Sequence, residues 1–141
     1  MKFSVRYYSR GGNTRAVAEV IAETLGVKAE SIDTPVDENV DFLFIGGGLF
    51  MGRLDGKLTD YIMNISPEKI GNIVPFGTSG GQKKVIDKIK ECAAKKGVKI
   101  DERDLYIQMG IKGHSWFGLK GGKLNAKQIN KTKEFAKGFI A

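Results

Sequence analysis

Cysteine, tryptophan and proline are scarce in this sequence of 141 residues, which has one, one and three of them, respectively. A single cysteine excludes an internal disulfide and a metal site built from several cysteines. Cys92 stands in a segment with helical spacing, so we expect it to pack in the core as a small apolar side chain.

Long apolar runs are also absent. The longest, residues 42–52, contains three consecutive glycines and is too short to cross a bilayer. Met1 and Lys2 lead straight into a strand-like pattern, without the apolar stretch of a secretory signal. We therefore expect a cytoplasmic protein without a membrane span.

Acidic residues are the smaller charged group, with 16 against 23 basic residues and a net charge of +7. This balance favours an acidic protein partner or an anionic substrate. A nucleic-acid binder is not favoured, because no motif that reads nucleic acid accompanies the charge. No repeat or linker divides the chain, so we expect residues 1–141 to form a single domain, as a monomer or a weak dimer.

Segments of two periodicities alternate along the chain. Strand-like runs lie at residues 2–8, 27–32, 41–46, 72–76 and 104–109, and helical spacing lies at residues 17–25, 55–65, 83–96 and 129–140. The alternation predicts an α/β fold of three layers, with a five-stranded parallel sheet and helices on both faces. Residues 42–45 and 73–76 lack polar alternation, which is typical of central strands.

Glycine, in contrast, is abundant, with 19 residues. It gathers where three strand-like runs end, at residues 9–14, 46–52 and 77–82, and again in a non-helical stretch at 110–124. In an open α/β sheet, ligands bind outside the carboxyl ends of the strands. These segments are therefore candidate ligand-binding loops.

The first loop has the chemistry of a phosphate site. It consists of Ser9, Arg10, Gly11, Gly12, Asn13 and Thr14, directly before a helix. Free N–H groups at a helix start bind anions, and the hydroxyls, the amide and the arginine would add donors and charge. The simpler alternative is a turn in which Asn13 or Gly12 only caps the helix.

Several other phosphate-binding classes do not fit this loop. It has no Gly-Lys-Ser or Gly-Lys-Thr ending, and its glycines lack the Gly-x-Gly-x-x-Gly spacing of dinucleotide folds. A small phosphatase would need a cysteine here. A phospho-accepting receiver domain would need an aspartate after the third strand, where residues 44–46 are Phe-Ile-Gly.

The same loop resembles the phosphate loop of flavodoxins, which usually has the form Ser/Thr-x-Thr-Gly-x-Thr. Residues 50–52, Phe-Met-Gly, are similar to the first flavin loop of short-chain flavodoxins, and residues 76–80, Phe-Gly-Thr-Ser-Gly, to the second. The resemblance implies strand order 2-1-3-4-5 and FMN at the switch between strands 1 and 3, a case that also illustrates the general rule for such sheets.

The resemblance also implies which residues bind the cofactor. Besides residues 9–14, these are Gly48, Leu49, Phe50, Met51, Gly52, Gly77, Thr78, Ser79, Gly80, Gly81 and Trp116. The apolar side chains at 49–51 would cover the flavin ring, although each could equally be ordinary core. Gly52 would allow the backbone to turn when the flavin N5 is protonated.

Two positions depart from the family pattern. Gly11 replaces the usual threonine, and Arg10 would compensate for the lost hydroxyl. The second flavin loop has Ser79 and Gly81 where an aromatic residue usually covers the outer flavin face. That face is then either open or closed by Trp116 or its neighbour Phe117. His114 is expected to be a solvated loop residue rather than a proton donor.

The sequence therefore predicts a flavodoxin-like FMN protein that transfers electrons between redox partner proteins. The alternative is an FMN-dependent oxidoreductase acting on a small molecule such as a quinone or a porphyrinogen. A flavin-free binding domain is the third possibility. Family members that carry electrons are typically acidic, so the basic charge here predicts a less strongly reducing flavin.

Overall fold

The computed structural model describes the chain except for residues 51, 80–83, 110–114, 117–118, 121 and 141. Its elements in order are β1 (Phe3–Tyr7), α1 (Asn13–Leu25), β2 (Ala29–Ser31), β3 (Val40–Phe50), β4 (Arg53–Leu54), α2 (Gly56–Met63), a 3-10 turn (Pro67–Lys69), β5 (Ile70–Ser79), α3 (Lys84–Lys96), β6 (Leu105–Gln108), β7 (Ser115–Trp116), β8 (Leu119–Lys120) and α4 (Ala126–Lys137).

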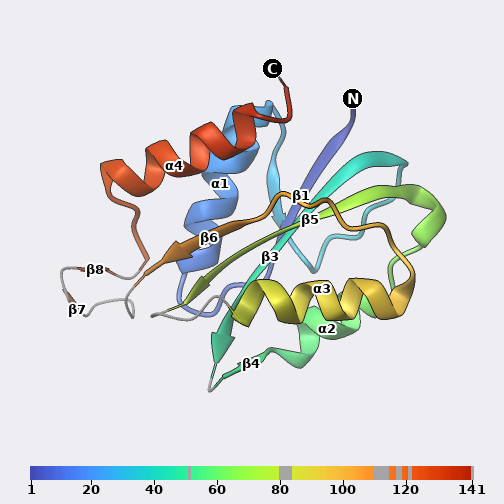
Figure 1. The fold of residues 1–141 in the computed structure, drawn as a ribbon, viewed down its shortest axis with the longest axis horizontal. Coiled ribbons are helices and arrows are strands. Elements are labelled where there is room, and N and C mark those ends of the chain that lie inside the picture. The colour runs from blue at the N-terminus through green and yellow to red at the C-terminus, as the bar shows by residue number, and fades with distance from the viewer. Residues whose placement is uncertain (51, 80–83, 110–114, 117–118, 121, 141) are drawn as a thin grey trace.

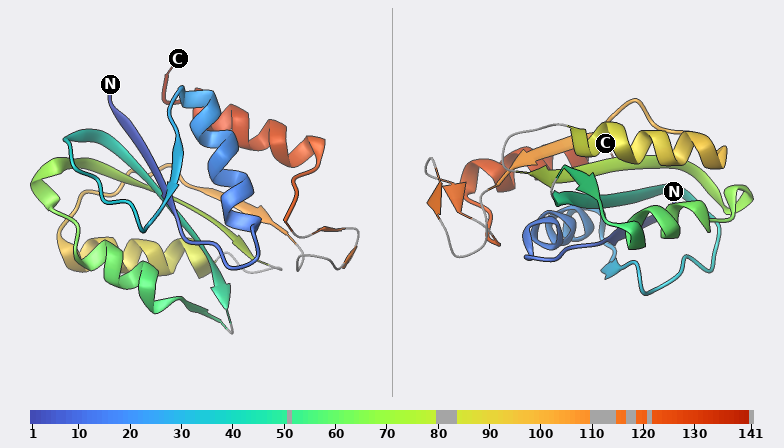
Figure 2. Two further views of the ribbon diagram at one scale, coloured as in Figure 1. Left: turned by 180° about the vertical axis from the view of Figure 1, so that it is seen from behind. Right: turned by 90° about the horizontal axis from the view of Figure 1, so that it is seen from below.

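The main sheet has the order β2-β1-β3-β5-β6, and all neighbours on this path are parallel. Counting these five strands in chain order gives 2-1-3-4-5, so the predicted order is confirmed. Helices α1 and α4 cover one face and α2 and α3 the other (Figures 1 and 2). The short strand β4 is an addition that the sequence pattern did not predict; it pairs antiparallel with the end of β3.

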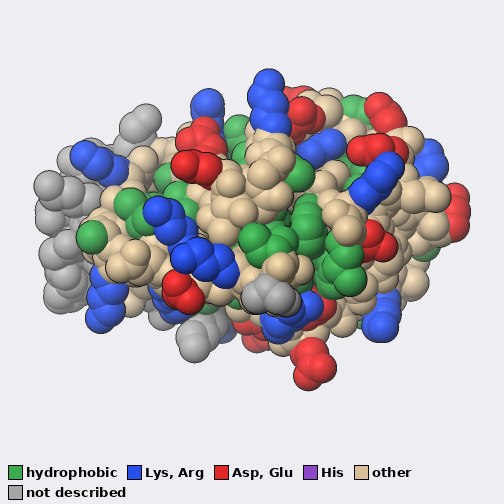
Figure 3. Space-filling view, turned by 90° about the horizontal axis from the view of Figure 1, so that it is seen from above, with side chains coloured by type: hydrophobic (Ala, Val, Ile, Leu, Met, Phe, Trp, Pro, Cys, Tyr) green, Lys and Arg blue, Asp and Glu red, His purple; other side chains and the backbone are tan. Residues whose placement is uncertain are grey.

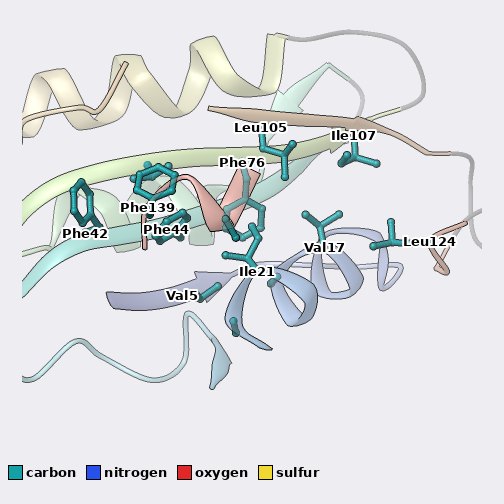
Figure 4. Packing of buried hydrophobic residues seen from close by; sticks show 14 of the residues in the cluster. Val5, Val17, Ile21, Phe42, Phe44, Phe76, Leu105, Ile107, Leu124 and Phe139 are labelled. Carbon is teal, nitrogen blue, oxygen red and sulfur yellow. The ribbon is translucent and has the colours of Figure 1, made fainter. Parts of the chain in front are cut away.

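The two central strands β3 and β5 are buried on both faces, as their unbroken apolar runs predict. Phe44 and Phe76 point to the α1 and α4 side, and Figure 4 shows them with Val17 and Ile21 of α1. Leu43, Ile45 and Ile73 pack against α2 and α3. Alternate residues of one strand thus supply two separate cores.

Cys92 of α3 is half-buried at the edge of the α2 and α3 core, and burial raises the pKa of its thiol. This matches the expected packing role.

The ends of β3 and β5 correct the expected loop boundaries. Both strands continue through their glycines, to Phe50 and Ser79, because these glycines allow close packing rather than a turn. A Cβ atom on Gly46 would lie 2.2 Å from the Phe76 ring, and one on Gly47 would lie 2.4 Å from Leu58. A Cβ atom on Gly77 would lie 2.6 Å from Val85.

Other boundaries shift by a few residues. α1 begins at Asn13, so the last two residues of the predicted phosphate loop, Asn13 and Thr14, belong to the helix. β2 is shorter than residues 27–32, and α4 begins and ends earlier than residues 129–140. Within the described part of the chain, no helix has the length and apolar character needed to cross a membrane.

Candidate functional site

The carboxyl ends of β1, β3 and β5 lie side by side at one edge of the sheet, so the three glycine-containing segments meet there (Figure 1). The chain leaves β1 toward the β2 edge and leaves β3 toward the β5 edge. The direction of the connections therefore reverses between β1 and β3, and this switch point is where open α/β sheets bind ligands.

The phosphate loop, residues 9–14, leads from β1 into the first turn of α1. Gly12 adopts a left-handed conformation, with φ of 91°, and its backbone N–H donates to Oγ of Ser9 at 3.0 Å. The first turn of α1 contains no acidic residue. The positive end of the helix therefore faces the loop without a carboxylate of its own turn to offset it.

Three side chains of the phosphate loop are each held by a different part of the chain. Nε of Arg10 donates to Oδ2 of Asp55 at 3.1 Å, and Nη2 binds the same oxygen. Oδ1 of Asn13 accepts from the backbone N–H of Gly122. Oγ1 of Thr14 lies 3.0 Å from Oγ1 of Thr78. The loop thus connects three separate segments, at 48–55, 77–79 and 115–122.

The contact between Thr14 and Thr78 is buried, with residue exposures of 2% and 3%. Gly48 lies against the same pair: a Cβ atom on it would be 3.7 Å from Oγ1 of Thr14 and 3.5 Å from Oγ1 of Thr78. Thr14, Gly48 and Thr78 therefore lie next to one another, and each comes from a different one of the three predicted loops.

The segment predicted to be the first flavin loop lies in a β-hairpin, as far as its residues 48–50 and 52 are described. Leu49 pairs with Leu54, and Phe50 pairs with Arg53, while Gly52 turns the chain with φ of 77°. The predicted Met51 lies outside the described residues. Leu49 is half-buried against the α2 and α3 core. The hairpin ends at Asp55, whose Oδ1 accepts from the backbone N–H of Lys57 and so caps α2.

The second flavin loop begins at the end of β5. Oγ of Ser79 lies 2.8 Å from the hydroxyl of Tyr106, which also donates to the Ser79 carbonyl at 3.2 Å. Gly80 and Gly81 lie outside the described residues. Tyr106 was not among the predicted site residues. Tyr106 is the second residue of β6 and pairs with Gly77 of β5, so its contact with Ser79 comes from the pairing of the two strands and has no local sequence signal.

The segment that contains Trp116 forms a small two-stranded sheet, in which Ser115 pairs with Lys120 and Trp116 with Leu119. The hydrogen bond between Gly122 and Asn13 attaches the end of this segment to the phosphate loop. His114 and Phe117 lie outside the described residues.

Basic side chains surround this edge. Exposed Arg10, Arg15, Arg53, Lys57, Lys84 and Lys123 lie on the loops and helix starts that follow the strands. Asp55 pairs with Arg10 and Glu19 with Arg15. The contact with Asp55 raises the pKa of Arg10, and the same contact lowers the pKa of Asp55. On the face shown in Figure 3, in contrast, basic and acidic side chains are interspersed.

The fold agrees with solved structures. A flavodoxin from the domain Archaea matches with a TM-score of 0.68 and 21% identity, over 96% of this chain and 94% of that one. The chain has the flavodoxin-like fold. No protein-family model matches the sequence, and no curated protein matches it.

Proteins with other names share the flavodoxin-like fold. An NADH:FMN oxidoreductase matches with a TM-score of 0.65 and 14% identity, over 99% of this chain and 88% of that one. The rubredoxin oxygen:oxidoreductase of Desulfovibrio gigas matches with a TM-score of 0.70 and 14% identity, over 96% of this chain. This chain spans only 34% of the length of that larger protein.

Proposed function

We propose that this chain binds FMN at the carboxyl edge of its sheet and transfers electrons between redox partner proteins. The observation that carries the proposal is the meeting of Thr14, Gly48 and Thr78, which brings all three glycine-containing segments to one point beside the start of α1. In this proposal, the three loops bind one ligand together and are not three unrelated turns.

In this proposal the phosphate loop holds the phosphate of FMN. The hydroxyls of Ser9 and Thr14, the amide of Asn13 and the backbone N–H groups of Gly11 and the first turn of α1 are the donors. Arg10 supplies positive charge beside them, from a side chain that is 52% exposed. This set of donors fits a dianion better than it fits a neutral ligand.

The two flavin loops hold the ring system. Gly48, Leu49, Phe50, Met51 and Gly52 provide the hairpin that flanks one side, and the backbone of Gly77, Thr78, Ser79, Gly80 and Gly81 serves the polar rim. Bound flavin would supply the redox chemistry, and the protein residues bind it, orient it and limit its contact with water. Trp116 is proposed to reach the outer face from the segment fixed at Asn13.

An FMN-dependent oxidoreductase acting on a small molecule is the second candidate. The observation that favours it is Ser79, which has its hydroxyl turned to Tyr106 at the position where an aromatic cover is expected. An uncovered ring face would admit a small substrate. The similarity to an NADH:FMN oxidoreductase is in keeping with this alternative.

The basic edge suggests the kind of partner. Among the residues that the structure describes, six exposed cations lie on the loops and helix starts at the site, and two of them pair with acids. We propose that the redox partner presents an acidic surface to this edge, and that the charge makes the flavin less strongly reducing than in acidic flavodoxins. Association that weakens steeply with salt would support the first statement.

Two measurements test the proposal, and the second separates the two candidates. Binding of FMN is tested by titration of the protein with FMN and with riboflavin. Anaerobic reduction then tests the role: an electron carrier takes up electrons from a reduced partner protein and oxidises NADH or NADPH slowly. Rapid oxidation of NADH or NADPH in the presence of a quinone would favour the oxidoreductase.

A further inference from the structure

Two buried threonine hydroxyls join the phosphate loop to the second flavin loop. Thr14 stands in the first turn of α1, and Thr78 is the next-to-last residue of strand β5. Their Oγ1 atoms are 3.0 Å apart. Each hydroxyl carries one hydrogen, and their mutual hydrogen bond uses one of the two. The other hydrogen is left for a second acceptor.

The surroundings hold this pair in place. Both residues are almost fully buried, and Gly48 is so near that a Cβ atom on it would be in van der Waals contact with both hydroxyl oxygens or close to it. In the described part of the chain, every buried side-chain nitrogen or oxygen has a hydrogen-bond partner, so this pair belongs to a well-satisfied interior. A buried hydroxyl that is already held in place can donate its hydrogen to a ligand without losing further side-chain entropy.

We propose that Thr78 is a positioning residue for phosphate, a role that rests on the proposed function. Its hydroxyl donates to Oγ1 of Thr14, which directs the Thr14 hydrogen toward the phosphate. The direction follows from acceptor strength: a phosphate oxygen at the start of α1 is a better acceptor than a second hydroxyl, so Thr14 donates outward and accepts from Thr78.

Replacing Thr78 by valine tests this role, because valine has nearly the same shape and lacks the hydroxyl. Thr78→Val is expected to weaken FMN binding by about tenfold, the effect of losing one hydrogen bond that serves a charged group. Riboflavin lacks the phosphate, so its affinity should stay within about twofold of the wild-type value. The ratio of the two dissociation constants is the readout.

Three further variants serve as controls. Thr78→Ser keeps the hydroxyl and should restore the wild-type ratio. Thr132→Val makes the same chemical change at another buried threonine, whose Oγ1 donates to the Gln128 carbonyl at 2.8 Å in α4, and should leave the ratio unchanged. Thr14→Val should lower FMN affinity by itself, and adding Thr78→Val to it should cost no further affinity, because the two act in series.

The outcomes separate this inference from the proposed function. If wild-type protein binds neither flavin, the proposed function is wrong. If it prefers FMN but Thr78→Val weakens FMN and riboflavin equally, or weakens neither, the positioning role is wrong. Should Thr78→Val fail to fold, Thr78→Ala and Thr78→Ser provide the same comparison, since they differ only in the hydroxyl.

Discussion

Asp55 binds the guanidinium of Arg10 with one carboxylate oxygen and caps helix α2 with the other. One side chain thus connects the phosphate loop to the end of the first flavin hairpin. The carboxylate also offsets the charge of Arg10 beside the proposed phosphate site. The two roles of Asp55 can be separated, because asparagine is as good a helix cap as aspartate but carries no charge.

Asp55→Asn is therefore expected to keep α2 intact and to free the charge of Arg10 for the phosphate. FMN affinity should rise by about two- to fivefold at low salt, as expected for a single exposed charge, and the gain should shrink as salt is added. Riboflavin affinity should not change. Flavin titration at two salt concentrations measures both effects, with Arg10→Gln as the matched variant that should weaken FMN. Weaker FMN binding by Asp55→Asn would contradict this reading.

Gly46 is predicted to tolerate no side chain. A Cβ atom there would lie 2.2 Å from the Phe76 ring, so Gly46→Ala should destabilise the fold by about 1–3 kcal/mol. Gly56→Ala, at the open start of α2, has nothing within 4 Å and should leave stability unchanged or raise it by up to about 1 kcal/mol. Urea unfolding of both variants provides the comparison, and equal effects would show that the close contact does not matter.

The close contact at Gly46 can also be tested by making the neighbouring side chain smaller. Adding Phe76→Leu to Gly46→Ala makes room for the new methyl group, so the double variant should lose less stability than the sum of the two single variants. Additive losses would mean that the methyl group is accommodated in some other way.

The end of the chain is held by Arg103. Its guanidinium lies 3.6 Å from the centre of the Phe139 ring and donates to both Asp101 carboxylate oxygens. Arg103→Lys should cost about 1 kcal/mol, because an ammonium group cannot stack on the ring and bridge both oxygens at once. Thermal unfolding measures the loss. An unchanged unfolding temperature would show that the stacking of the Arg103 guanidinium on the Phe139 ring does not stabilise the fold.

The same ion pair predicts a pH dependence. The hydrogen bond from Arg103 lowers the pKa of Asp101 in the folded protein. The pair therefore stabilises the fold fully above the ordinary aspartate pKa of about 3.9, and this contribution is lost as the pH falls through the lower folded value. Asp101→Asn should be less stable than wild type at pH 7, and the difference should shrink below about pH 4. A difference that stays constant down to pH 2 would contradict this assignment.

The charge of the flavin hairpin should set the potential of the bound flavin. Arg53 and Lys57 are exposed on or next to this hairpin, so replacing both by glutamine should lower the potential of the fully reduced couple by about 10–40 mV, the electrical equivalent of a weak charge contact. Replacing both Lys95 and Lys96 by glutamine, in the last turn of α3 at the far edge, is the matched control, because it also removes two charges. Equal shifts in both proteins would mean that only net charge matters.

The sequence predicted the sheet well, because β3 and β5 are apolar on both faces and five strand-like runs alternate with helices. It did not predict β4, since Arg53 and Leu54 form a strand only by pairing with Phe50 and Leu49. It placed Gly46 and Gly47 in a loop, because the need for glycine there comes from Phe76 and Leu58, which are distant in sequence.

The sequence predicted the segments of the candidate site but not the contacts that connect them. The phosphate loop and the edge of the sheet followed from glycine placement after the strands. The pairs that link the loops are Arg10 with Asp55, Thr14 with Thr78 and Ser79 with Tyr106. Each joins residues brought together only by the parallel sheet, so local patterns contain no signal for them.

The central claim is that the three loops form one FMN site. Titration of the protein with FMN, followed by flavin fluorescence and by the emission of Trp116, tests it most directly. We predict quenching of the flavin with one FMN bound per chain, tighter binding than for riboflavin, and a concurrent change in tryptophan emission. Unchanged flavin fluorescence at all protein concentrations would contradict the claim, and the three loops would then be turns of a common fold.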